Sequence, residues 1–76
     1  MAKIPAIRGE AAIRAFAKVG FRLARISPFH HILKKPGVIS ELSIPVHAGK
    51  TIKPGLLRRQ IRAAGLTVEE FIALLD

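Results

Sequence analysis

Residues 21–46 read FRLARISPFHHILKKPGVISELSIPV, and this stretch decides the fold because apolar and polar side chains alternate along it. The strands that we expect cover about 21–26, 29–34 and 41–46. Pro28 enforces a turn or bend after the first strand, and Pro36-Gly37 suits the two central positions of a type II turn, where glycine supplies a positive φ. Pro45 indicates a strand that ends or lies at a sheet edge. The stretch therefore predicts a three-stranded antiparallel sheet.

Helical spacing of apolar residues precedes and follows these strands. We expect a first helix over about 9–19, with Gly20 at the position of a helix terminator. Pro54 suits the first turn of a second helix, which ends near Gly65. A short last helix begins at Thr67, because Thr67-Val68-Glu69-Glu70 has the pattern of a capping box.

The chain of 76 residues supports one domain, so we assign residues 1–76 to a single unit. The order helix, three strands, helix, short helix predicts an α+β fold, α-β-β-β-α with a short C-terminal helix. Both main helices would cover one face of the sheet and leave the other face open, as in double-stranded-RNA-binding domains. No segment approaches the ~20 apolar residues needed to cross a bilayer, and the N-terminus lacks the apolar run of a signal peptide. We expect a cytoplasmic protein without a membrane partner.

Positive charge dominates the middle of the chain. The formal net charge is +8, and from Ala11 to Val68 the only acidic residue is Glu41, against 11 Lys and Arg. A field of one sign attracts polyanions, so nucleic acid is the leading candidate partner, although exposed helix positions favour Arg for solubility alone. The cations that we expect to contact an RNA backbone are Arg22, Arg25, Lys34, Lys35, Lys50, Lys53, Arg58, Arg59 and Arg62.

The residues most suited to chemistry are the adjacent histidines His30 and His31. The chain has no cysteine, no Ser-His-acid set and few carboxylates, so a histidine is the only obvious catalyst. Neighbours on a strand point to opposite faces, so at most one of the two can serve a given site, and hydrophobicity does not decide which face is buried. Taken alone, the pair is most simply interpreted as one core and one surface histidine. Because the two diverge and Glu41 is the sole nearby carboxylate, we expect no metal site and no cofactor.

Four segments carry a family resemblance. They read HHILKKPG (30–37), IPVHAGK (44–50), IKPGLLR (52–58) and AGLTVEEF (64–71). In order and spacing they are similar to the motifs of the HicA family of toxins, small bacterial mRNA interferases whose fold resembles the double-stranded-RNA-binding domain. The resemblance implies an endoribonuclease that cleaves mRNA without a metal, and a HicB-like antitoxin protein as its partner.

The resemblance also implies which residue is catalytic. In that family the catalytic histidine lies within a Gly-Ser-His-His-like motif on the second strand, and its second histidine position falls on His31, with His30 as the runner-up. If His31 is on the open face, it would move protons while a 2′-hydroxyl attacks the adjacent phosphorus. Lys34, Lys35 or Arg25 would stabilise charge on the phosphoryl oxygens.

The chain departs from this pattern directly before the histidine pair, where Pro28-Phe29 replaces the Gly-Ser of the family. An inactive HicA-like member is therefore one alternative to the toxin. The main rival, which rests on the cationic elements, is a non-catalytic module that binds RNA by shape. A third, an adaptor that binds another chain through an open sheet edge, predicts no RNA affinity beyond the nonspecific level.

Overall fold

The structure is a computed structural model that describes residues 3–76, so the first two residues of the expected domain lie outside the described range. The elements, in chain order, are α1 (Gly9–Ala17), β1 (Arg22–Ser27), β2 (His30–Lys34), β3 (Leu42–Pro45), α2 (Pro54–Ala63) and α3 (Val68–Ala73). The strands form an antiparallel sheet in the order β1-β2-β3. This arrangement confirms the predicted α+β fold.

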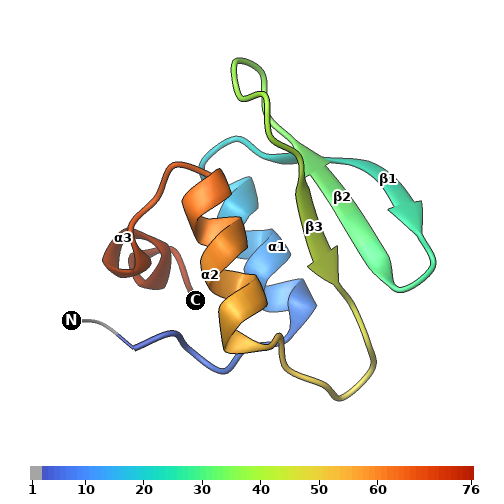
Figure 1. Cartoon of the computed structure of the whole chain (residues 1–76), viewed down its shortest axis with the longest axis vertical. Helices are drawn as coiled ribbons and strands as arrows, with labels where there is room; N and C mark the ends of the chain where they lie inside the picture. Colours follow the sequence, from blue (N-terminus) through green and yellow to red (C-terminus); the bar gives the residue numbers. More distant parts are fainter. Residues whose placement is uncertain (1–2) are drawn as a thin grey trace.

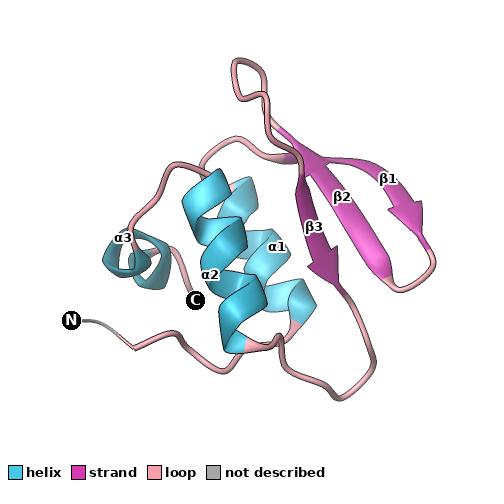
Figure 2. Ribbon diagram, in the orientation of Figure 1, coloured by secondary structure: helices cyan, strands magenta, loops and turns pink. Residues whose placement is uncertain are grey.

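The two main helices lie on one side of the sheet (Figure 1). Both pack against β3, and β1 lies furthest from them, so β1 extends beyond the helical layer. The short helix α3 sits beyond the main helices, on the side away from the sheet (Figure 2). One face of the sheet is therefore covered by helices, most completely at β3, and the other face is open.

Most differences from the predicted boundaries occur where residues expected at the end of a helix or strand belong to a turn instead. The helix α1 ends at Ala17 rather than near residue 19, because the backbone N–H groups of Lys18 and Val19 bond carbonyls three residues back and tighten the last turn. Phe29 belongs to the β1–β2 turn rather than to β2. The Pro36-Gly37 turn is confirmed: Gly37 has φ 83°, and the Val38 N–H donates to the Lys35 carbonyl at 3.1 Å.

Three phenylalanines anchor the core between sheet and helices. Phe16 on α1 contacts Phe21 edge to face, with ring centroids 5.9 Å apart, and lies 4.9 Å from the ring of Phe71 on α3. All three are fully buried. From the sheet, the buried side chains are Leu33, Leu42 and Ile44, and from α2 they are Leu57 and Ile61. Apolar burial of this kind is the main stabilising term of a small domain.

Gly9 lets the start of α1 lie directly against the end of β3. This glycine is buried, and a Cβ atom at its position would lie 2.3 Å from the carbonyl oxygen of Pro45. No side chain fits in that space. The close approach fixes the position of α1 relative to the sheet.

The C-terminal segment is held by a cap and by an ion pair. The Thr67 side chain accepts from the Glu70 N–H, and the Glu70 carboxylate accepts from the Thr67 N–H, which confirms the predicted capping box. After α3, the Asp76 carboxylate accepts from Lys18 Nζ at 2.6 Å and lies 3.4 Å from Arg14 Nε. Both cations belong to α1, so the end of the chain is tied to the first helix.

The two edges of the sheet differ. At the outer side of β3, the Ser43 N–H donates to the Gln60 side chain of α2 at 2.9 Å. At the other edge, β1 pairs only with β2 within residues 3–76, and an irregularity interrupts its register between Leu23 and Arg25. Leu23 and Ile26 of this strand are 51% and 64% exposed. None of the helices described is both long enough and apolar enough to span a membrane.

Candidate functional site at the histidine end of the sheet

The pairing of β2 assigns each histidine to a face. His31 lies opposite Ile44. Leu33, two residues further along β2, lies opposite Leu42. Ile44, Leu33 and Leu42 are fully buried, so His31 shares the helix-facing side of the sheet. By alternation His30 lies on the open face, opposite Ser27. The chemistry expected from the sequence requires a histidine on the open face, and His30 rather than His31 meets that requirement.

The surroundings of the two rings also differ. Nδ1 of His31 is buried and has no hydrogen-bond partner within residues 3–76. Nδ1 of His30 lies 3.2 Å from the carbonyl oxygen of Pro28. Because a carbonyl only accepts, this Nδ1 must carry the proton, which leaves Nε2 of the neutral ring as an acceptor. The turn before β2 therefore orients the His30 ring and sets its tautomer.

The Pro28-Phe29 turn joins β1 to β2 with a two-residue loop. Proline fixes φ near −65°, and Phe29 has φ 65°, which together are the signature of a type II turn. Glycine is the usual residue at the second position, and a bulky residue with positive φ costs about 1–3 kcal/mol. The turn that orients His30 is therefore strained at Phe29.

Phe29 also contacts the loop after β3. Its ring stacks on the imidazole of His47, with centroids 5.0 Å apart and planes 15° from parallel. The Phe29 carbonyl accepts from the Val46 N–H at 2.9 Å. The sequence predicted a turn here but not the stack of Phe29 on His47. The only signal for this contact in the sequence is an aromatic residue directly after a turn proline.

The predicted cations fall into separate groups. Lys34 is on the same face as His30 but four residues further along β2, about 13 Å away at the rise of a strand. Lys35 follows it, with Nζ 5.8 Å from the centroid of the Phe21 ring. Arg22 donates to the carbonyls of Ala17 and Phe21 at 3.1 and 3.0 Å. These three cations gather at the end of the sheet away from the histidines.

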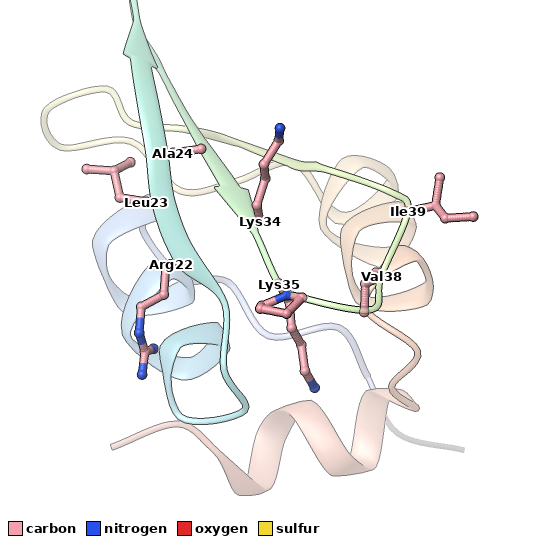
Figure 3. Close-up of a pocket in the computed structure, with 8 residues that line it drawn as sticks. Arg22, Leu23, Ala24, Lys34, Lys35, Val38 and Ile39 are labelled. Carbon is pink, nitrogen blue, oxygen red and sulfur yellow. The ribbon is translucent and has the colours of Figure 1, made fainter.

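A hollow of about 490 Å³ lies at that far end (Figure 3). Lys34 and Lys35 point to opposite sides of the ribbon there, and Arg22 extends toward the same side as Lys35. The remaining lining residues are Leu23, Ala24, Pro36, Val38 and Ile39. The charged groups diverge and no histidine or carboxylate lines the hollow, so it lacks the convergent polar groups of a catalytic pocket.

Glu41 forms ion pairs with two of the cations on the open face. Its carboxylate pairs with Arg25 at 3.2 Å and with Lys34 at 3.1 Å, and the hydrogen bonds from Arg25 and Lys34 hold the pKa of Glu41 below its usual range. Arg25 lies opposite Ile32, which makes it a diagonal neighbour of His30 on the same face. Of the cations expected beside the catalyst, Arg25 alone has a backbone position next to His30, and its guanidinium is held by Glu41.

Two further cations lie at the histidine end. The loop after β3 and the start of α2 enclose a hollow of about 370 Å³, lined by Pro45, His47, Lys50, Thr51, Ile52, Lys53 and Leu56. This loop leaves the sheet at the same end as the β1–β2 turn (Figure 1). Neither Lys50 nor Lys53 forms an ion pair within the part of the chain described.

The arginines of α2 form a third group. Arg58, Arg59 and Arg62 are exposed, as the apolar stripe of the helix predicted. Arg58 and Arg62 line a small hollow with Thr67 and Val68 at the joint between α2 and α3. They are therefore displaced from the histidines along the helix axis.

Metal ligands do not converge anywhere in the described range. No three His, Asp or Glu side chains within residues 3–76 come close enough together to hold a metal ion. The groups available at the histidine end are an imidazole with a free acceptor nitrogen, a second imidazole stacked on a phenyl ring, and two unpaired ammonium groups. Such a set can accept a proton and bind phosphate.

Comparison with known proteins assigns the family. A search of curated proteins finds no match to the chain. A family model described as the HicA toxin of bacterial toxin–antitoxin systems matches residues 9–66, from the first residue of α1 to the residue before the α3 cap. The match covers most of the chain and confirms the family resemblance; it contains the first three sequence segments and ends within the fourth, at residue 66. The chain belongs to the HicA family of toxins.

Proposed function

We propose that residues 1–76 form a single-domain, metal-independent endoribonuclease toxin that cleaves mRNA in the cytoplasm. The observation that carries this proposal is the open-face ring of His30, whose Nδ1–H is held by the Pro28 carbonyl at 3.2 Å and whose Nε2 is free. Membership of a toxin family supports it independently. No cofactor enters the proposed reaction, because the histidine supplies the proton transfer.

In the proposed step, Nε2 of His30 accepts the proton of a 2′-hydroxyl while O2′ forms a bond to the adjacent phosphorus. The bond from phosphorus to O5′ breaks, and the departing oxygen receives a proton from a solvent water, which leaves a 2′,3′-cyclic phosphate and a 5′-hydroxyl. Proton transfer by a positioned histidine contributes roughly 10²–10⁴-fold to such a reaction. Arg25 is the diagonal neighbour of His30, and it would stabilise charge on the phosphoryl oxygens once its guanidinium leaves the ion pair with Glu41.

The geometry favours His30 over His31 as the base, although the family motif points to His31. His31 faces the helices, and its Nδ1 is buried. This position suits a structural role for His31, in which it supports the backbone of β2 from the helix-facing side, better than contact with RNA.

We extend the proposal to the RNA-binding cations. Lys50 and Lys53 are assigned to phosphates next to the cleaved bond, because they lie at the histidine end without a carboxylate partner in the described range. Arg58, Arg59 and Arg62 continue the cationic surface along α2. Lys34, Lys35 and Arg22 would bind RNA further away, at the other end of β2.

A HicB-like antitoxin is the proposed protein partner, since the family belongs to toxin–antitoxin systems. With a net charge of +8 on this chain, an acidic surface on the antitoxin would speed and orient association. Binding over the open face would cover His30 and block access of RNA.

The first test is cleavage of a long single-stranded RNA in buffer that contains a chelator. We expect the unmodified chain to cut RNA and leave an all-deoxy strand intact, because the nucleophile is the 2′-hydroxyl. The variant His30→Ala should lose roughly 10²-fold or more of the rate. His31→Gln, which keeps a polar side chain at the half-buried position, should retain most of it. Thermal unfolding of each variant separates lost chemistry from lost structure.

Two outcomes would overturn this assignment. Loss of cleavage with His31→Gln alone, in a folded protein, would return the catalytic role to His31. Binding of RNA without cleavage by the unmodified chain would favour an RNA-binding module, or a HicA-like member made inactive by Pro28-Phe29 in place of the family Gly-Ser.

A further inference from the structure

The Phe29–His47 stack is an exposed aromatic surface beside the proposed catalytic base. Phe29 immediately precedes His30 in sequence, and its ring stacks on His47 from the loop after β3. Phe29 is 65% exposed and takes no part in the buried core. It is therefore an apolar side chain that the fold does not bury.

The fold alone gives no reason for a phenylalanine at this position. The backbone has φ 65°, a conformation that glycine adopts without strain and that a bulky side chain resists. The ring leaves most of its apolar surface in water and adds conformational strain to the turn. An exposed, strained residue next to a candidate catalytic group points to a role in binding.

The surroundings of the stack identify the chemistry of its ligand. His47 lines the hollow that also holds Lys50 and Lys53, so the aromatic surface adjoins two ammonium groups without carboxylate partners within residues 3–76. A ligand that combines a flat π face with a neighbouring negative charge complements this surface. A nucleotide within a single strand has both features, whereas the paired bases of a duplex do not offer their faces.

We infer that Phe29 and His47 form a nucleobase platform, on which an unpaired base of the RNA stacks while Lys50 and Lys53 hold its phosphates. The inference rests on the proposed function, which supplies RNA as the ligand. It adds that the platform selects RNA by its unpaired bases. A base seated on Phe29 would place the adjoining sugar-phosphate near His30. The platform therefore restricts binding to single-stranded or locally unpaired segments.

The test measures binding of a short 2′-O-methyl oligoribonucleotide, which keeps bases and phosphates but has no nucleophilic hydroxyl. Phe29→Gly should weaken binding roughly 5- to 100-fold, as expected when one stacked base is lost. Phe29→Tyr should retain the affinity. An oligomer of the same length that carries abasic residues should bind the unmodified chain and Phe29→Gly equally. Glycine suits φ 65°, so Phe29→Gly should unfold at no lower a temperature than the unmodified chain.

A fluorescent reporter locates the base directly. The chain contains no Trp and no Tyr, so Phe29→Trp introduces the only strongly emitting side chain. Its emission should be quenched by the base-bearing oligomer and not by the abasic one. Ile72→Trp is the matched control, because Ile72 is an exposed apolar residue of α3, which lies beyond the main helices on the side away from the sheet. Its emission should be unaffected by either oligomer.

Several results would overturn the platform. Equal weakening of base-bearing and abasic oligomers by Phe29→Gly would show that the turn serves only phosphate binding or local structure. Unchanged RNA affinity together with weaker binding to an antitoxin would assign the rings to a protein interface. The oligomer cannot be cleaved, so these outcomes are independent of whether the chain is a ribonuclease.

Discussion

Gly9 and Phe29 show how single residues determine the geometry of this protein in opposite ways. At Gly9 the missing side chain lets α1 approach the Pro45 carbonyl, where an added Cβ would lie 2.3 Å from the oxygen. At Phe29 a bulky side chain is held at a φ of 65°, in a region that favours glycine. The first position serves packing, and the second has no packing role in the core.

We predict that Gly9→Ala lowers the free energy of unfolding by about 1–3 kcal/mol, because the methyl group forces α1 away from β3. Gly55→Ala is the matched control. Gly55 is also near a helix start, but its Cβ would meet nothing within 4 Å, so alanine there should be neutral or stabilise by up to about 1 kcal/mol. Denaturant titration of both variants gives the comparison. Equal effects of the two substitutions would contradict the close approach at Gly9.

At the residue scale the sequence predicted the kinds of group in the site but not their directions. Alternation placed His30 and His31 on opposite faces, yet both faces of β2 carry apolar residues, so only the pairing with buried Ile44 assigns His31 to the helix side. The stack of Phe29 on His47 joins residues from two separate turns. No local pattern encodes such a contact.

At the scale of elements, α3 shows how a six-residue helix is held in place. Its N-terminus has a reciprocal capping box, and Phe71 inserts into the core beside Phe16. Beyond its C-terminus, Lys18 Nζ donates both to the Leu74 carbonyl at 2.8 Å and to the Asp76 carboxylate. Helices this short have little stability of their own, so these contacts position it.

The tether at Asp76 predicts a pH dependence. The hydrogen bond and charge of Lys18, with a smaller effect of Arg14, hold the pKa of Asp76 below its ordinary value of 3.8. Because the folded chain binds this proton less tightly than the unfolded chain, the contribution to stability is present above pH 3.8 and is lost as pH falls through the folded pKa. Asp76→Asn should therefore lose less stability on acidification than the unmodified chain.

Thermal unfolding at neutral pH and in acid provides the measurement. Part of the acid sensitivity should remain in Asp76→Asn, because Glu41 also has a lowered pKa, through Arg25 and Lys34. Parallel pH profiles for Asp76→Asn and the unmodified chain would show that the tether does not stabilise the fold.

The elements themselves were well predicted, because each begins or ends at residues with strong local preferences. Pro54 starts α2, Gly65 follows it with φ 80°, and Thr67 caps α3. The register interruption after Leu23 was not predicted. It depends on how β1 pairs with β2, and a short alternating sequence is compatible with either a regular or an interrupted strand.

At the scale of the whole molecule, the net charge of +8 is divided among distinct surfaces. Sheet cations at the far end bond carbonyls or Glu41, whereas Lys50 and Lys53 adjoin the histidine end. The sequence showed the sign of the charge but not this division, because cations on different elements are brought together or separated only by the tertiary fold.

Salt dependence tests which cations bind phosphate. For a single strand, each neutralised phosphate contributes about −0.7 to the slope of log affinity against log salt. Lys53→Gln should make the slope shallower by about 0.7 for the 2′-O-methyl oligomer. Lys18→Gln removes the same charge from a lysine paired with Asp76 and should leave the slope unchanged. Equal changes in both variants would mean that only the overall charge matters.

The unequal edges of the sheet limit how copies of this chain can associate. Gln60 occupies an outward N–H of β3, whereas the outer edge of β1 has no partner strand within residues 3–76. Hydrogen bonding of strands between molecules is therefore less obstructed at β1 than at β3. Two copies joined through β1 would use the more open edge of each molecule and leave only the partly blocked β3 edges outside, which favours a closed pair over a fibre.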